Sequence, residues 1–177
     1  MTEKRQNTIT AYPSQEAEIG HWLGAFQDAR QRTLEQLEGA VQPVIDWLPP
    51  DNESSIGTVL YHITLIEADW LYTEVLEQQP PAEVEALFSY NHRDAQGRLT
   101  QIQGFSLAHY LTLLETVRSL LLDVYQQMGL SDFRRARSLE MYDVTPEWVL
   151  HHLMQHEAEH RSQIGSLRYR AERALSQ

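Results

Sequence analysis

Residues 106–129 read SLAHYLTLLETVRSLLLDVYQQMG, and this stretch decides the fold class. Its apolar residues recur at alternating intervals of three and four, which is the spacing of one buried face of a helix. Ser106 is a good N-cap, and Gly129 is a natural residue to follow the helix end. The positions on that face are Leu107, Tyr110, Leu114, Val117, Leu121, Val124 and Met128. Such a regular face predicts a core helix that packs along other helices in a bundle.

Three further segments predict amphipathic helices around it. The first covers roughly residues 14–42, with Ser14 as a candidate N-cap. The second covers roughly residues 54–78 and ends before two prolines, and the last runs from Thr145 to about Arg173, where Thr-Pro-Glu is typical of a helix start. No apolar alternation of period two is long enough for a sheet, so the sequence predicts an all-α protein.

The long connection between the second and third helices, residues 79–105, is unusual for a compact domain. A crossover of this length lets the third helix run parallel to the second, as in bundles that are not simply up-down-up-down. It could also cover one end of the bundle, which makes Tyr90, His92, Arg93 and Asp94 candidates to line a pocket. The alternative is an ordinary solvated loop.

Composition limits the classes of function. The chain has 177 residues, 42% of them hydrophobic, which suits one domain over residues 1–177. Its net charge of −11 opposes binding to nucleic acid and to anionic membranes. The absence of cysteine excludes disulfides, thiolate metal sites and a cysteine nucleophile, and it fits a cytoplasmic protein. We find no signal peptide and no apolar run long enough to span a membrane.

Two of the eight histidines lie on the buried face of the last helix. That face is formed by Val149, Leu153, His156, His160, Ile164 and Leu167. Burying two imidazoles costs several kcal/mol if their nitrogens lack partners. Residues four apart share one helix face, so the two rings could converge on one metal ion and remove this cost. The alternative is a pair of hydrogen-bonded core histidines.

A third histidine strengthens the metal hypothesis. His62 lies in the second helix, one turn after Val59 and one turn before Ile66, on or beside the buried face. Three inward histidines on two helices match a metal site in a bundle core. His152 is a rival ligand, but choosing it would leave His160 unexplained. His21 and His109 have polar neighbours and are expected on the surface.

The stretch HEAEH, residues 156–160, also fits the H-E-x-x-H pattern of zinc peptidases. That class needs a further ligand downstream, but Gln163 and Ser166 stand where the longer motif has Gly and His. Nothing upstream predicts a peptide-binding strand either. We therefore assign the two histidines to a different kind of metal site.

Three charged residues have open roles. Glu157 lies next to a candidate ligand and could be a general base or hold that ligand by a hydrogen bond, or it could simply face solvent. Asp69, one heptad after His62, is a weaker candidate of the same kind. Arg30 interrupts the apolar face of the first helix, and we expect it to snorkel at the bundle edge rather than clamp a substrate.

The segments LYHITLIEADWL and VLHHLMQHEAEHRSQI together resemble the DinB/YfiT-like superfamily of metalloenzymes, over nearly the whole chain. The resemblance implies a four-helix bundle of up-down-down-up topology that is commonly a homodimer. It implies a divalent ion, zinc or nickel, on His62, His156 and His160. Family members often read H-R-G-Q-I after the last ligand, whereas this chain has Ser162 in place of the glycine.

Three functions are compatible with such a site. The resemblance implies a transferase or isomerase that uses a low-molecular-weight thiol on a small electrophile, and the thiol must come from a cosubstrate because the chain has no cysteine. A hydrolase of small molecules would use metal-bound hydroxide. A stress-related metal or ligand binder would have no activity.

Overall fold

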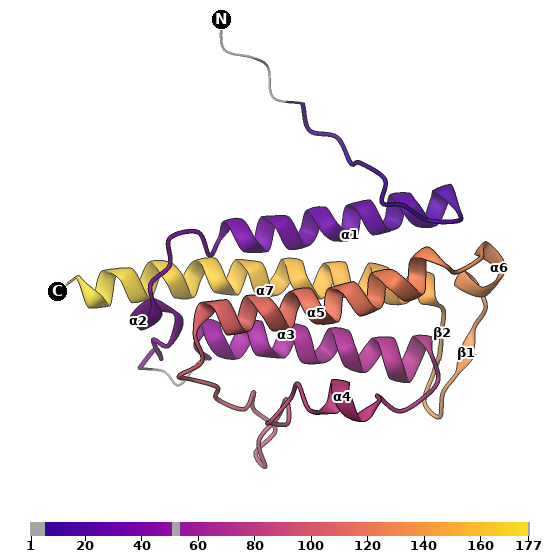
Figure 1. Ribbon diagram of the computed structural model, residues 1–177. Helices are drawn as coiled ribbons and strands as arrows, with labels where there is room; N and C mark the ends of the chain where they lie inside the picture. The colour runs from indigo at the N-terminus through magenta and orange to yellow at the C-terminus, as the bar shows by residue number, and fades with distance from the viewer. Residues whose placement is uncertain (1–5, 51–53, 177) are drawn as a thin grey trace, which may run out of the picture.

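Four long helices dominate the computed structural model, which describes residues 6–50 and 54–176. They are α1 (Ala17–Glu35), α3 (Ile56–Trp70), α5 (Leu107–Gln126) and α7 (Pro146–Leu175). In Figure 1 they lie side by side, with α1 and α7 running in one direction and α3 and α5 in the other. This mainly helical structure confirms the predicted all-α class.

The remaining elements are short and belong to the segments that connect the long helices along the chain. They are α2 (Gln42–Ile45), the π-helical segment η1 (Leu71–Val75), α4 (Ala82–Glu85), α6 (Leu130–Phe133), β1 (Arg137–Ser138) and β2 (Asp143–Val144). The two strands form a small antiparallel hairpin in which Arg137 lies opposite Val144. Among the described residues, no helix has both the length and the apolar character needed to cross a membrane.

Two of the predicted helix starts are confirmed by their caps. The Ser106 hydroxyl accepts the backbone N–H of His109 at 3.2 Å, and the Thr145 hydroxyl accepts that of Trp148 at 3.2 Å. These bonds satisfy N–H groups that have no partner within the first turn of a helix. The start of α3 is capped in the same way by Ser55, one residue later than the predicted boundary.

The first helix is shorter than predicted at both ends. Ser14 does not cap it, because its hydroxyl accepts the N–H of Glu16, which itself lies at the N-cap position. At the other end α1 stops at Glu35, and the chain then turns through Gly39, whose φ of +71° favours glycine. The predicted helix over residues 14–42 therefore merged α1 with a turn and the start of α2.

The crossover of residues 79–105 runs back along the outside of α3, as Figure 1 shows, and is attached to it at two points. The Ile102 N–H donates to the Thr58 hydroxyl at 2.8 Å. The Tyr61 hydroxyl accepts the N–H of Tyr90 at 2.9 Å. The crossover is thus a strap held against the helix that carries His62, rather than a loop solvated on all sides.

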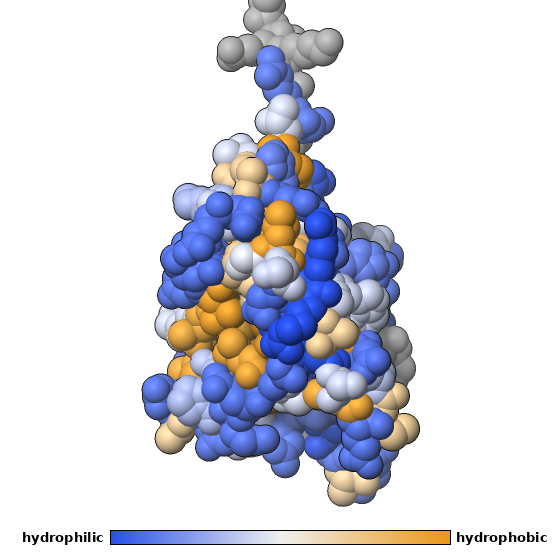
Figure 2. Space-filling view, turned by 90° about the vertical axis from the view of Figure 1, so that its right-hand side faces the viewer, coloured by the Kyte–Doolittle hydropathy of each residue, from blue (hydrophilic) through white to orange (hydrophobic). Residues whose placement is uncertain are grey.

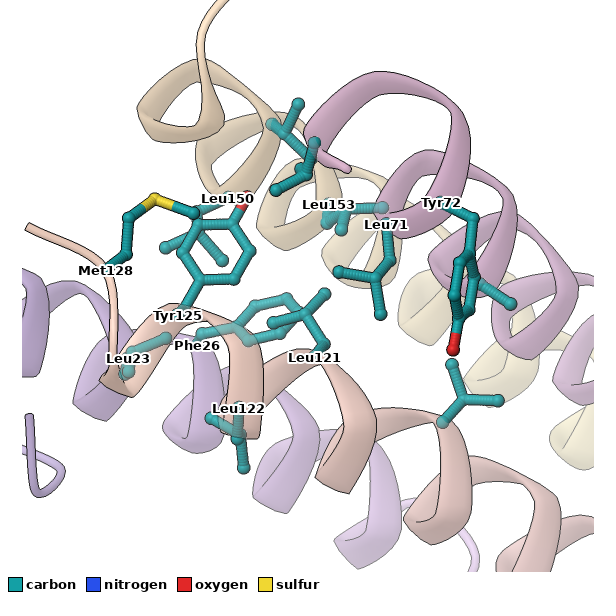
Figure 3. Close-up of a cluster of buried hydrophobic side chains, with 14 of the residues drawn as sticks. Leu23, Phe26, Leu71, Tyr72, Leu121, Leu122, Tyr125, Met128, Leu150 and Leu153 are labelled. Atoms are coloured by element: carbon teal, nitrogen blue, oxygen red, sulfur yellow. The ribbon is translucent and has the colours of Figure 1, made fainter. Parts of the chain in front are cut away.

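The hydrophobic core consists of two clusters at successive levels along the helices. Figure 3 shows part of the first, in which side chains from α1, η1, α5 and α7 point toward one another: Leu23, Phe26, Leu71, Leu121, Tyr125 and Leu150. The second includes Val59, Ile63, Tyr110, Leu114, Ile164 and Leu167. Most of the predicted face of residues 107–128 is buried in these two clusters, although Leu107 and Val124 are only half-buried.

A buried layer of charge lies between the two clusters. It is formed by one residue from each long helix: Arg30, Glu67, Arg118 and Glu157. Arg30 bonds Glu157 at 2.6 Å and Glu67 at 2.8 Å, and Arg118 bonds the same two carboxylates at 2.8 and 2.6 Å. We call this group the four-residue charge cluster. Its formal charges cancel, which a water-excluded site requires.

The predicted snorkelling of Arg30 is therefore wrong. Only 6% of Arg30 is exposed, and its Nη1 also donates to the Leu114 carbonyl at 3.1 Å. Arg118, for which the sequence suggested no role, stacks its guanidinium on Phe26 at 3.5 Å from the ring centroid. Both side chains are fully used in cross-linking helices.

Candidate metal centre

His62 on α3 and His156 and His160 on α7 come together as predicted. The Nε2 atom of His156 lies 3.2 Å from that of His62 and 3.1 Å from that of His160. One ligand atom from each ring falls within 4.8 Å of the other two. His62 is buried, while His156 and His160 are half-buried, so the cluster faces partly toward the surface. Residues four apart on α7 thus meet a third ring from the neighbouring helix.

These separations fit a shared ion. Nitrogen ligands ~2.1 Å from one ion lie roughly 3.0–3.4 Å apart when the angle between them is between a right angle and tetrahedral. Hydrogen bonding alone accounts for the cluster less well. If Nε2 of His160 and of His62 are both unprotonated, a single proton on His156 would have to be shared between two acceptors.

Burial keeps two of the rings neutral. It lowers the pKa of His156 to about 3, helped by the neighbouring His160 and His62 rings. It lowers the pKa of His62 to about 4, with further contributions from His160, His92 and Arg93. A neutral imidazole has a free lone pair, which is the form that binds a divalent ion.

Gln163 fixes the orientation of one ligand. The Nδ1–H of His160 donates to the Gln163 side-chain oxygen at 2.9 Å, which leaves the Nε2 lone pair free. By contrast, Nδ1 of His62 is buried and has no partner among the described residues. An unpaired buried polar atom costs about 1–3 kcal/mol, so His62 occupies a position that packing alone does not favour.

Glu157 is not part of the histidine cluster. It is 1% exposed, so the alternative of a solvent-facing side chain is wrong. Burial alone would raise its pKa, but Arg30 and Arg118 outweigh this effect and hold the pKa below its usual value. Because both carboxylate oxygens are bonded to guanidinium groups, the predicted general-base role is not supported by these contacts and stays a prediction.

The weaker candidates lie outside the cluster. The ring of His152 stacks on Trp148 with an interplanar angle of 8° and a centroid distance of 5.0 Å. Asp69 is exposed and accepts a bond from the Thr73 hydroxyl. His21 and His109 are exposed, as predicted.

A polar pocket of about 450 Å³ lies next to the histidine cluster. It is lined by Ser54, by Arg98, Leu99 and Gln101 of the crossover, and by Glu159, Ser162, Gln163, Ser166, Leu167 and Arg170 of α7. Gln163 belongs to both sites, since it lines the pocket and bonds His160. We call this the polar pocket.

The part of the crossover that lines the polar pocket lies a few residues later than the predicted candidates. None of the four candidates, Tyr90, His92, Arg93 and Asp94, lines this pocket, which is lined instead by Arg98, Leu99 and Gln101. Tyr90 lines a different pocket, of about 290 Å³, with Phe88 and Leu65. Asp94 accepts the N–H groups of Gln96 and Arg98 and so shapes the turn that leads into the lining segment.

The bond from His160 to Gln163 gives a testable prediction. Changing Gln163 to leucine keeps the approximate side-chain size but removes the acceptor that orients His160. We expect metal affinity to fall by about 10–100-fold, as is typical when a partner of a ligating histidine is lost. Competition with a chromogenic chelator measures this. Gln155→Leu is the matched control, because Gln155 is exposed on the same helix; an equal effect of both changes would contradict the assignment.

These features define a class of protein: an all-α chain with a three-histidine cluster, suited to a divalent ion, on two neighbouring helices. The sequence model of the DinB superfamily matches residues 25–164, and the chain belongs to this superfamily. The match includes all three histidines. No curated protein sequence is significantly similar to this chain.

Proposed function

We propose that this protein is a metal-dependent enzyme that holds a divalent ion, zinc or nickel, on His62, His156 and His160. The observation that carries the proposal is the convergence of three imidazole nitrogens beside a polar pocket. An all-histidine donor set suits zinc and nickel better than magnesium or calcium, which prefer oxygen ligands. A divalent ion held by His62, His156 and His160 would keep its full charge, because imidazole ligands carry no negative charge, and it would supply Lewis acidity that lowers the pKa of a thiol or water.

The reaction that we favour is transfer of a low-molecular-weight thiol to a small electrophile. In this reaction the thiol sulfur forms a bond to the electrophilic carbon, the leaving group departs with the electron pair, and the thiol proton passes to solvent. The hydroxyl and amide groups of Ser162, Gln163 and Ser166 on one side of the polar pocket, and of Gln101 on the other, would orient the substrates by hydrogen bonds. Superfamily membership and the polar pocket beside the histidines support this assignment.

Two other functions remain as alternatives. The same site could serve a hydrolase of small substrates, in which water rather than a thiol is activated. It could also belong to a metal or ligand binder without activity.

The finer fold assignment, a four-helix bundle of up-down-down-up topology, is part of the proposal and is supported by the helix directions in Figure 1. A homodimer and a cytoplasmic location stay predictions.

One experiment separates these functions. Purified protein that has never been exposed to chelator is mixed with chlorodinitrobenzene and either glutathione or cysteine, and thiol consumption is followed. We expect thiol-dependent turnover in the wild type, loss of turnover in His156→Ala, and retention in His151→Ala, because His151 is exposed and is not one of the three clustered histidines. Release of nitrophenol from nitrophenyl acetate without thiol would favour the hydrolase. Bound metal with no turnover in either assay would favour the binder.

A further inference from the structure

A second pocket, which none of the three histidines lines, has a different chemical character. Its volume is about 610 Å³, within the range of small-molecule sites. It is lined by Trp70 at the end of α3, by Ala136, Tyr142, Asp143 and Val144 in and around the β hairpin, and by Thr145 and Trp148 at the start of α7. We call it the hairpin pocket. Figure 2 views the molecule from the end with α6 and the hairpin, where hydrophobic residues gather between hydrophilic ones.

The walls of the hairpin pocket are aromatic and solvent-accessible. Trp148 is 48% exposed and Tyr142 is 46% exposed, so these rings are not used only for packing. The ring of Trp70 lies 5.6 Å from that of Trp148, and the His152 ring contacts both, so a ligand would use the tryptophan faces that are turned away from His152. Large exposed aromatic side chains that line one concave site are typical of ligand recognition.

The one charged residue among those that line this pocket is acidic, and the two arginines that flank Ala136 in the chain, Arg135 and Arg137, are both paired with Asp132. Asp143 is among the lining residues, its carboxylate also accepts the Ser138 hydroxyl, and none of the lining residues is Lys or Arg. The Tyr142 hydroxyl donates to Oε1 of Glu74 at 2.9 Å, which adds electron density to the phenol ring. Glu74 is only 6% exposed, and its second oxygen has no partner among the described residues. Burial raises the pKa of Glu74, so this group adds less negative charge behind the tyrosine than an exposed carboxylate would.

Trp70 and Glu74 lie where the regular helix α3 gives way to a π-helical segment. Trp70 ends α3, and the π-helical segment η1 that follows carries Glu74. Such π-helical turns change the directions of side chains relative to a regular helix and are frequent at functional sites. The result is that one tryptophan and one carboxylate, four residues apart, both meet the β hairpin.

We propose that the hairpin pocket binds a small organic cation, such as a substituted ammonium group. The faces of aromatic rings are negative and attract cations, most strongly for tryptophan, and a nearby carboxylate adds to this attraction. The aromatic rings of Trp70, Tyr142 and Trp148 supply the faces, and Asp143 supplies the carboxylate. The proposal does not depend on the metal centre or on the reaction assigned to it.

Choline is a suitable probe, and its carbon isostere, in which a tert-butyl group replaces the trimethylammonium group, is the neutral control. We expect calorimetry to show choline binding at least about tenfold tighter than the isostere, because only the cation gains from the rings and the carboxylate. The measurement is made on the full chain as purified. Metal content is recorded in parallel, so that failure of this proposal is distinct from failure of the metal site.

Three variants test the assignment to these residues. Asp143→Asn keeps the shape of the pocket and is expected to weaken choline while leaving the isostere unchanged. Trp148→Ala is expected to weaken choline by about tenfold or more. Tyr169→Ala is the control, because Tyr169 is an exposed aromatic residue elsewhere on α7. Equal affinity for both probes, no saturable choline binding in the millimolar range, or equal effects of Trp148→Ala and Tyr169→Ala would each overturn the proposal.

Discussion

Replacing His156 with alanine is expected to abolish metal binding, from about one ion per chain in the wild type to almost none. His156 is the central ligand, since its Nε2 lies within 3.2 Å of the same atom in both other rings. Without it, His62 and His160 come from different helices with no ring between them. Two ligands rarely hold an ion against water, so the loss should be nearly complete. Elemental analysis of protein that has never met a chelator measures the metal content.

The matched control is His152→Ala. His152 lies on the same helix one turn earlier, but it stacks on Trp148 and is not part of the cluster. The variant His152→Ala should therefore keep the wild-type metal content. His62→Ala should lose the ion as His156→Ala does. Wild-type metal content in His62→Ala would contradict the three-histidine site. Loss of metal in His152→Ala would indicate that His152 is a ligand, which would also contradict the assigned set.

The second large effect concerns the four-residue charge cluster. Changing Arg118 to leucine removes one of two positive charges and leaves two buried carboxylates facing Arg30 alone. Breaking a buried pair in this way typically lowers the free energy of unfolding by about 3–5 kcal/mol. The Arg118 side chain also donates to the Phe26 carbonyl at 3.0 Å, and this donor is lost as well. Urea unfolding followed by circular dichroism measures the change through the midpoint and slope.

Arg32→Leu is the control for this measurement. Arg32 bonds Asp28 at 2.7 Å on the surface, where solvent screens an ion pair and its loss should change the stability little. A double variant sharpens the test: Arg118→Leu with Glu157→Leu removes one charge of each sign and leaves the Arg30–Glu67 pair. We expect it to be more stable than the sum of the two single effects predicts. A loss below about 1 kcal/mol in Arg118→Leu would contradict the assigned importance of the cluster.

The helices could be predicted from local sequence because their signals are local. Spacing of apolar residues in residues 106–129 and the caps at Ser106 and Thr145 depend on neighbours within one or two turns. The error at residues 36–42 has the same origin. Apolar periodicity continued through this turn, and the conformation of Gly39 is the feature that separates α1 from α2.

The charge cluster could not be assigned from one helix at a time. Arg30, Glu67, Arg118 and Glu157 each stand at a buried position, and each alone looks like an interruption of an apolar face. A sequence signal does exist, since two basic and two acidic residues occupy inward positions on four helices. Which residue pairs with which depends on the relative heights of the helices, and this is a property of packing.

The chemistry of the histidines was determined by the sequence itself, because imidazoles at buried positions four residues apart need partners wherever the helix lies. The sequence also indicated His62 as their partner. Only the tertiary structure decided three contacts. It brings Nε2 of His62 to 3.2 Å from Nε2 of His156, and it pairs Glu157 with Arg30 and Arg118. It also places Gln101 of the crossover in the same pocket as Gln163. Contacts between residues distant in the chain follow from how the helices pack and where the crossover is attached, and local spacing carries no information about either.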